Sequence, residues 1–304
     1  MRAVVTGGAG FIGSHVAEAL VARGDEVHVL DSLATGNREK VPEGAELHVG
    51  DIRSGSADLF AQVQPDVCFH LAAQADVRTS VERPDYDADV NVLGTLQVLE
   101  ASRAHATHVV FSSTGGAIYG ECDGPAPEDA PRRPISPYGI SKLAGEEYLG
   151  GWNRLFGSHH VALRFANVFG PRQEASLEGG VVAIFLERMA AGQETTIFGD
   201  GAQTRDFIYV GDVVSAVVAA ATHRGGVFNV GTGVELSVNE LHAACRRVSG
   251  DERPPSYADP RPGDIRRSVI DPSLAQRELG WRAEHSLEEG LRLTWEATQE
   301  EARA

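Results

Sequence analysis

The chain has 304 residues, of which 42% are hydrophobic and 23% are charged, and this composition excludes an intrinsically disordered chain. Its 27 Lys and Arg residues against 43 Asp and Glu residues give a net charge of −16. That charge argues against nonspecific binding to nucleic acid or to an anionic membrane.

The sequence shows no targeting or membrane segment. No stretch reaches the ~18 apolar residues of a membrane span, and the start lacks the apolar region of a signal peptide. We therefore expect a cytoplasmic protein. Cys68, Cys122 and Cys245 lie far apart and outside any metal-binding spacing, so we expect reduced structural thiols and no metal site.

Residues 2–6 are predicted to form a short strand and residues 11–22 a helix, with a glycine-rich segment between them. Bare backbone at a strand-to-helix turn lets a pyrophosphate approach the free N–H groups of the helix start. The pattern therefore predicts a dinucleotide site that includes Gly7, Gly10, Phe11, Ile12 and Gly13.

A second predicted strand, 26–30, ends at Asp31, 18 residues after Gly13. A carboxylate at this place accepts hydrogen bonds from the adenosine ribose and repels a 2′-phosphate, so NAD is favoured over NADP. Arg38 lies a few residues further on and keeps NADP open as an alternative.

Further strands are predicted at 46–49, 67–71 and 108–112, and helices separate them. The last two strands are apolar runs, as in a parallel sheet that is buried on both faces. The predicted class is α/β, a doubly wound Rossmann domain that spans residues 1–166, followed by a smaller substrate-binding domain.

Ligands collect at the carboxyl ends of such strands. The residues expected there are Asp51, Ile52, Leu71, Ala72, Ala73, Gln74 and Ser112. Asn91 interrupts the apolar helical pattern 86–104; it is either a cofactor contact or an amide that is satisfied within the core.

Tyr138 and Lys142 lie four residues apart at the start of a predicted helix, 137–156, and therefore share one face. A tyrosine with a pKa near ~10 is a poor base at neutral pH, but a neighbouring ammonium group favours its phenolate form. The pair predicts a proton-transfer site.

These motifs together resemble the extended short-chain dehydrogenase/reductase superfamily, and within it the UDP-galactose 4-epimerase group of NAD-dependent sugar-nucleotide epimerases. The resemblance implies that Tyr138 and Lys142 are the catalytic YxxxK pair and that Thr114 is the catalytic hydroxyl. The segment at Gly115 and Gly116 is one residue longer than usual, so Ser113 is an alternative to Thr114. Val168 is implied as a further cofactor contact.

Residues 167–304 lose the regular alternation and are expected to bind the substrate, with some elements returning to the first domain. Helices are predicted at 181–191, 212–222, 238–248 and 287–298, and strands at 196–198 and 227–230. By resemblance, the residues that contact a UDP-sugar are Asn167, Val181, Ile197, Phe198, Arg205, Arg261 and Asp264.

Ser268 is a specificity candidate by the same resemblance. It stands where the family selects the size of the sugar C2 substituent, but it is also read as the start of a strand, 268–270. The resemblance further implies a homodimer.

The implied reaction is inversion at C4 of a UDP-hexose through a 4-keto sugar, with tightly bound NAD. The identity of the hexose is undecided between a neutral sugar and a uronate, because Arg78 and Arg172 are both candidates to bind a C6 carboxylate. One alternative is a sugar-nucleotide 4,6-dehydratase, although Gly115 and Gly116 replace the Asp-Glu pair of those enzymes. Another is a non-catalytic NAD-binding protein on the same fold.

Overall fold

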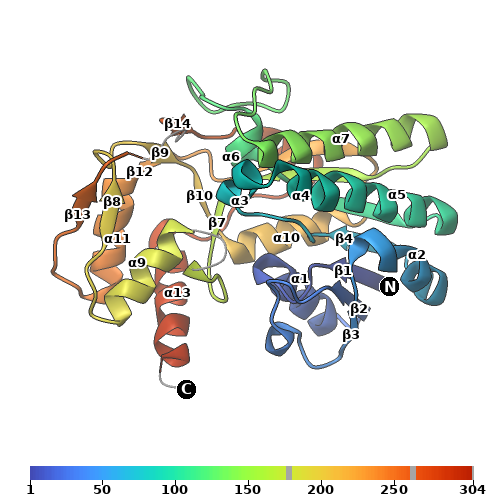
Figure 1. Cartoon of the computed structure of the whole chain (residues 1–304), viewed down its shortest axis with the longest axis horizontal. Helices are drawn as coiled ribbons and strands as arrows, with labels where there is room; N and C mark the ends of the chain where they lie inside the picture. The colour runs from blue at the N-terminus through green and yellow to red at the C-terminus, as the bar shows by residue number, and fades with distance from the viewer. Residues whose placement is uncertain (176–179, 261–264, 303–304) are drawn as a thin grey trace.

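The structure, a computed structural model, describes residues 1–175, 180–260 and 265–302 (Figure 1). Its centre is a seven-stranded sheet in which every pair of neighbours is parallel. In spatial order the strands are β11 (Gly226–Val230), β6 (Val161–Phe165), β5 (His108–Thr114), β4 (Val67–His70), β1 (Arg2–Thr6), β2 (Glu26–Asp31) and β3 (Ala45–Val49). The predicted doubly wound α/β class is confirmed.

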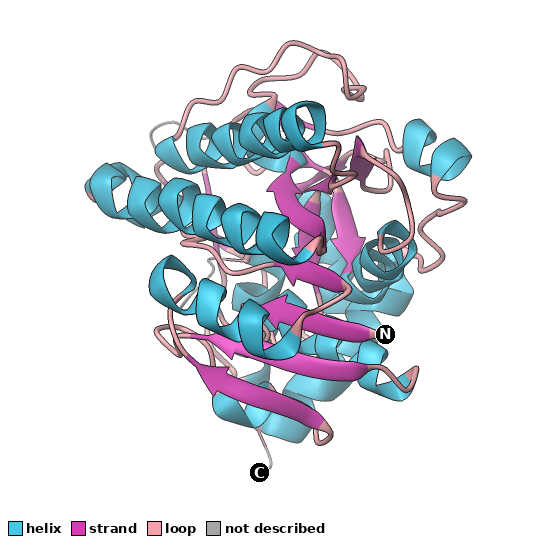
Figure 2. Cartoon of the chain, turned by 90° about the vertical axis from the view of Figure 1, so that its right-hand side faces the viewer, coloured by secondary structure: helices cyan, strands magenta, loops and turns pink. Residues whose placement is uncertain are grey.

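Helices cover both faces of this sheet (Figure 2). Successive strand residues point to opposite faces, so Val5 packs with α1 (Phe11–Ala22) and α10 (Val210–Ala220), whereas Val4 packs on the other side. That second face is covered by α2 (Ile52–Val63), α5 (Gly94–His105) and α7 (Pro137–Phe156).

A smaller lobe lies on the left of Figure 1. Its core joins α9 (Val181–Ala190), α11 (Val238–Ser249) and α13 (Leu287–Glu301) through apolar residues such as Phe185, Leu241 and Leu291. The short strands of this part are β7 (Asn167–Phe169) with β10 (Phe207–Tyr209), β8 (Thr196–Phe198) with β13 (Ser256–Ala258), and β9 (Thr204–Arg205) between β12 (Leu236–Ser237) and β14 (Arg267–Ser268).

The remaining short elements connect these layers. They are η1 (Arg38–Lys40), α3 (Val77–Glu82), α4 (Pro84–Ala88), η2 (Asp89–Leu93), α6 (Gly115–Ile118) and α12 (Ser273–Glu278). Within the described part of the chain, no helix is both long and apolar enough to cross a membrane.

The helix predicted at 86–104 is divided, because η2 between α4 and α5 is a π-helical turn. Asn91 lies in this turn, and its backbone oxygen accepts a hydrogen bond from the hydroxyl of Thr95 at 2.6 Å. Such turns interrupt helices most often near functional sites, and the loop that Asn91 holds lines the cleft described next.

Candidate active site

A cleft of about 1440 Å³ runs from the carboxyl ends of the large sheet to the smaller lobe. It exceeds the ~300–1,000 Å³ of an ordinary single-ligand pocket, so it has room for more than one ligand. The predicted residues that line it are Gly7, Gly10, Phe11, Ile12, Gly13, Asp31, Asp51, Ile52, Leu71, Ala72, Ala73, Gln74, Ser112, Ser113, Tyr138, Lys142, Asn167, Val168, Val181, Ile197, Phe198 and Arg205.

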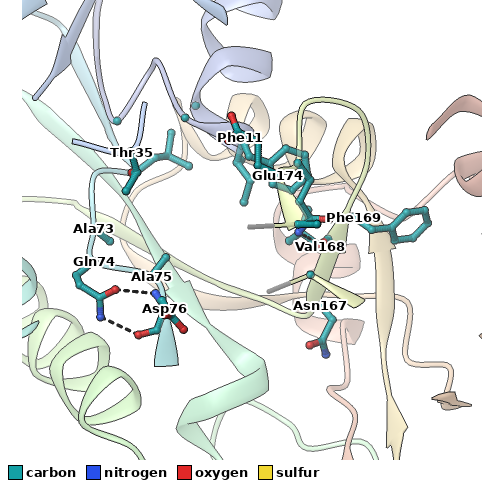
Figure 3. Close-up of a pocket in the computed structure, with 18 of the residues that line it drawn as sticks. Phe11, Thr35, Ala73, Gln74, Ala75, Asp76, Asn167, Val168, Phe169 and Glu174 are labelled. Atoms are coloured by element: carbon teal, nitrogen blue, oxygen red, sulfur yellow. Dashed lines mark hydrogen bonds between the residues drawn. The ribbon is translucent and has the colours of Figure 1, made fainter. Parts of the chain in front are cut away.

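Figure 3 shows the turn that contains Gln74 and Asp76 on one side of the view, and Asn167 and Val168 on the other. The turn is closed by hydrogen bonds in both directions. The Asp76 N–H donates to Gln74 Oε1 at 2.7 Å, and Gln74 Nε2 donates to the Asp76 carbonyl at 2.9 Å.

The glycine-rich turn has no room for side chains. Gly7 has φ +72°, and a Cβ there would lie 2.7 Å from the Ala72 nitrogen. A Cβ at Gly13 would lie 2.1 Å from the Gly7 oxygen. Helix α1 begins after Gly10, which has no side chain to cap it, so the N–H groups of its first turn are open to an anion. This cradle fits the diphosphate of a dinucleotide.

Asp31 ends β2 and is held in place by backbone donors. Its Oδ2 accepts from the Ala9 N–H at 2.9 Å, and its Oδ1 accepts from the Leu33 N–H at 2.8 Å. Its carboxylate lines the cleft, whereas the exposed Arg38 is not one of the described residues that do. This arrangement fits a ribose with a free 2′-hydroxyl.

Helix α7 presents Tyr138 and Lys142 to the cleft. The helix begins with Pro137, and the Ser136 hydroxyl caps it by accepting from the Gly139 N–H at 3.2 Å. Lys142 is 3% exposed, and its Nζ donates to the Ser112 carbonyl at 2.9 Å. Burial lowers the pKa of Lys142 to about 8, against the opposite effects of Asp87 and Glu146.

The hydroxyls at the end of β5 point in different directions. Ser113 lines the cleft, but it is buried and its hydroxyl donates to Glu146, which forms a 2.7 Å ion pair with Arg164. Thr114 is half-buried. A Cβ built at Gly116 would lie 3.9 Å from Thr114 Oγ1 and 3.7 Å from the amide nitrogen of Asn167, which lines the cleft. Thr114 itself is not among the described residues of the cleft wall.

Asn91 was predicted either as a cofactor contact or as an amide satisfied within the core. It is 2% exposed and is not among the described lining residues. Its Oδ1 accepts from the Gln74 N–H at 2.8 Å, and its Nδ2 donates to the Gln74 carbonyl and to Asp87 and lies 3.2 Å from the Ser141 hydroxyl. All its polar groups bond to the protein, so it positions the Gln74 turn from behind.

A buried histidine supports the same turn. The Thr95 hydroxyl donates to the Asn91 carbonyl, so it accepts from His70 Nε2 at 3.0 Å. Nδ1 of His70 therefore accepts from the Thr6 hydroxyl at 2.8 Å, and that oxygen accepts from the Ala72 N–H. Burial, with a smaller effect of Lys142, lowers the pKa of His70 to about 3, which keeps the ring neutral.

The smaller lobe supplies the other end of the cleft. Ile197 and Phe198 of β8 and Arg205 of β9 line it, and the Arg205 guanidinium donates to the Thr204 carbonyl at 2.8 Å. Arg261 and Asp264 lie outside the described residues.

Ser268 was predicted either as a specificity residue or as the start of a strand. It is 2% exposed in β14, paired in register with Arg205, and the described cleft wall does not contain it. Its interpretation as a strand residue is the one that the structure supports.

Several residues that line the cleft were not predicted from the sequence: Lys40, Thr79, Tyr86, Gln173, Arg188 and Gln203. They come from loops and helices outside the glycine-rich turn and the strand ends. No motif marks them, because only the fold brings them to the cleft.

Comparison with known proteins agrees with this geometry. A sequence model of the NAD-dependent epimerase/dehydratase family matches residues 3–231. UDP-glucose 4-epimerase of Mycolicibacterium smegmatis is 45% identical over 306 residues, which cover 97% of this chain and 98% of that protein.

Two solved structures are similar throughout. One is UDP-glucose 4-epimerase of Thermotoga maritima with UDP-glucose (TM-score 0.97, 45% identity, 99% of this chain and 100% of that chain). The other is UDP-glucose 4-epimerase of Thermus thermophilus in complex with NAD (TM-score 0.93, 46% identity, 98% of this chain and 99% of that chain). The protein therefore belongs to the NAD-dependent epimerase/dehydratase family.

Proposed function

We propose that the protein is a UDP-hexose 4-epimerase that interconverts UDP-glucose and UDP-galactose. The observation that carries the proposal is that Tyr138 and Lys142 line the same continuous cleft as the residues predicted to hold the dinucleotide and the nucleotide sugar. The glycine-rich turn and Asp31 line it from the large sheet, and Ile197 and Arg205 line it from the smaller lobe. A nucleotide sugar held by the smaller lobe would place its hexose near Tyr138.

The glycine-rich turn and Asp31 would hold NAD, which would supply reversible hydride transfer at C4 of the sugar. Tyr138 takes the proton of the C4 hydroxyl and gives it back, as a positioned acid and base. Lys142 supplies a positive charge one helical turn away, which favours the phenolate. Thr114 is the hydroxyl that we assign to the C4 oxygen, since Ser113 is engaged with Glu146.

The two arginines that were predicted to meet a C6 carboxylate do not line the cleft, and this supports a neutral hexose. Arg172 forms a 2.7 Å ion pair with Glu18 on α1, and neither Arg172 nor Arg78 is among the described residues that line the cleft. A uronate would need a cation near C6, and neither predicted candidate supplies one there.

An anomeric-proton NMR assay tests the proposal. We expect the purified protein, without added NAD, to convert UDP-glucose to an equilibrium mixture with UDP-galactose, and to act more slowly on UDP-glucuronate. A 4-keto-6-deoxy product would identify a dehydratase instead, and the absence of turnover with bound cofactor would identify a non-catalytic protein.

We further propose a cytoplasmic homodimer that pairs through α5 and α7. Ile140, Tyr148 and Leu155 lie along one stripe of α7 with exposed fractions of 56%, 41% and 74%, and Phe156 beside them is 50% exposed. Exposed apolar stripes of this kind commonly mark an interface.

A further inference from the structure

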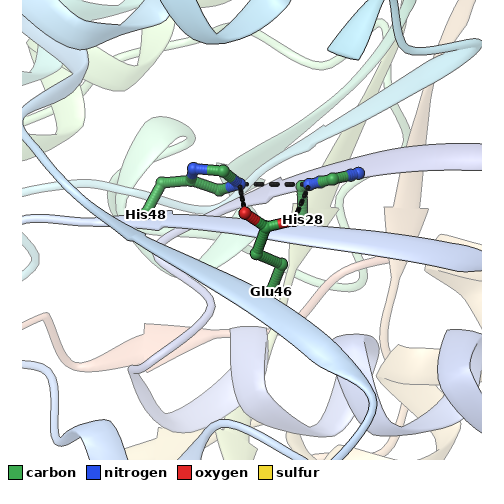
Figure 4. A group of neighbouring side chains, drawn as sticks. All are labelled: His28, Glu46 and His48. Carbon is green, nitrogen blue, oxygen red and sulfur yellow. Dashed lines mark hydrogen bonds and ion pairs between the residues drawn. The ribbon is translucent and has the colours of Figure 1, made fainter. Parts of the chain in front are cut away.

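Two histidines and a carboxylate converge at the edge of the large sheet, away from the cleft. His28 lies in β2, directly opposite Glu46 in the parallel register, and His48 follows Glu46 by two residues in β3. Residues that alternate along a strand share a face, so all three side chains project from one face. Their ligand atoms lie within 4.8 Å of one another (Figure 4).

Two of the three separations match those of ligands around one metal ion, and the third is a few tenths of an ångström shorter. His28 Nδ1 is 3.0 Å from His48 Nε2 and 3.5 Å from Glu46 Oε2, and His48 Nε2 is 3.6 Å from Glu46 Oε1. Ligands at about 2.0–2.2 Å from a tetrahedral Zn²⁺ ion stand about 3.3–3.6 Å apart. Small side-chain adjustments therefore bring the three atoms into coordination.

A fourth side chain orients the first histidine. Nε2 of His28 lies 3.1 Å from Glu26 Oε1, so Glu26 accepts the ring N–H and leaves the Nδ1 lone pair directed at the cluster. A carboxylate behind a histidine is the usual outer partner of a metal ligand. His28 is 8% exposed, which fixes its ring within the sheet.

We propose that His28, Glu46 and His48 bind one divalent transition-metal ion of the Zn²⁺ class, and that Glu26 positions His28 for it. Two imidazoles and a carboxylate suit such ions. The Glu46 side chain is 61% exposed, so water completes the coordination. None of the four residues belongs to the described cleft walls; the ion instead fastens β3, the edge strand, to β2.

The sequence alone predicts no metal site, because it contains no Cys and His residues at the close spacings of common metal sites. This cluster joins residues that lie 18 positions apart, and only the strand pairing brings them together. The one local signal is the alternation Glu46-Leu47-His48, which is common in strands.

The test is Zn²⁺ titration of the full-length protein after chelator treatment, by calorimetry, with the visible spectrum of bound Co²⁺ as a second readout. We expect one ion per chain. Glu26→Gln removes only the outer partner of His28 and should weaken Zn²⁺ binding by about 10- to 100-fold. His48→Gln and Glu46→Gln each remove a ligand and should weaken Zn²⁺ binding more than that. His105→Gln and Glu300→Gln, on α5 and α13, are matched controls and should bind like the unchanged protein.

Amide hydrogen exchange tests the fastening of β3. Zn²⁺ should slow exchange in residues 45–49 of the unchanged protein and leave His48→Gln unaffected. All variants should retain UDP-glucose epimerisation, which shows that they fold. Absence of stoichiometric binding, or equal binding by His48→Gln and the controls, would overturn the site.

Discussion

The ammonium group of Lys142 is buried, and its burial makes the free energy of unfolding depend on pH. Burial lowers its pKa to about 8 in the folded protein, whereas an unfolded lysine titrates near ~10.4. The unfolded state binds more protons between these values, so the contribution of Lys142 to stability rises as pH increases from about 8 to about 10.

Lys142→Met removes that titration. Urea unfolding at pH 7.5 and pH 9.5 should show the unchanged protein gaining, relative to Lys142→Met, on the order of 1–3 kcal/mol in the free energy of unfolding. A pH-independent difference between the two proteins would mean that Lys142 is not desolvated in solution.

Tyr138 is the proposed acid and base, and its hydroxyl is the only group removed in Tyr138→Phe. We expect this variant to retain the fold and the bound cofactor and to lose ~10²- to 10⁴-fold in turnover. The anomeric NMR assay measures turnover, and cofactor absorbance of the purified protein measures retention. Full activity would exclude Tyr138 from the proton transfer.

Asp31 sets the choice of cofactor in our proposal. Asp31→Ser removes the carboxylate that accepts from the ribose and repels a 2′-phosphate, so NAD should bind more weakly and the preference for NAD over NADP should shrink. Calorimetric titration of cofactor-free protein with each dinucleotide measures both effects. Unchanged discrimination would assign the ribose to another residue.

Strand β6 and helix α7 are joined by a buried ion pair. Arg164 and Glu146 are each 2% exposed, and Arg164 also donates to the Tyr119 hydroxyl at 2.7 Å. Removing one partner of a buried pair leaves the other charge unpaired. Glu146→Leu should therefore lower the free energy of unfolding by about 3–5 kcal/mol.

The matched control is Glu147→Leu on the same helix. Glu147 pairs with Arg132 at the surface, where an ion pair contributes little, and urea unfolding should show a small change. If the two variants lowered the free energy of unfolding equally, the effect would come from the substitution in helix α7 and not from the unpaired buried charge.

Elements with strong local signals were predicted closely. Strand Arg2–Thr6, helix Phe11–Ala22 and helix Pro137–Phe156 have the predicted bounds, because each is long or marked by glycine or proline. The two-residue strands β9 and β12 were missed, and β14 overlaps the predicted strand 268–270 only at Ser268. Such short segments carry no periodicity, and they exist only because distant segments pair.

The same difference between local signals and distant contacts applies to the candidate site. The sequence predicted the glycine-rich turn and the ends of strands, where topology alone gathers ligands. Asn91 and Ser268 were each predicted either as ligand contacts or as structural residues, Ser268 by resemblance to the family, and both side chains are buried by packing. Which way a side chain turns depends on its neighbours in space, as the opposite environments of Ser113 and Thr114 illustrate.

At the scale of the whole molecule, the proposed dimer depends on the exposed stripe of α7. Leu155→Glu places a charge where two copies would meet, and desolvating it should dissociate the dimer into monomers. Sedimentation velocity measures the mass. Val234→Glu, at a residue that is 63% exposed near the smaller lobe, is the control and should stay dimeric. A monomeric unchanged protein, or a dimeric Leu155→Glu, would contradict this interface.

The order of the strands also governs how the chain acquires its structure during synthesis. β6 ends at Phe165, but its outer neighbour β11 ends at Val230, about 65 residues later. At ~5–20 residues per second, a ribosome needs roughly 3 to 13 s to supply that neighbour. During this interval β6 presents an unpaired edge, the feature through which nascent chains aggregate. Ribosome-arrested chains ending before Gly226 should therefore be more sensitive to protease than chains in which β11 has left the exit tunnel.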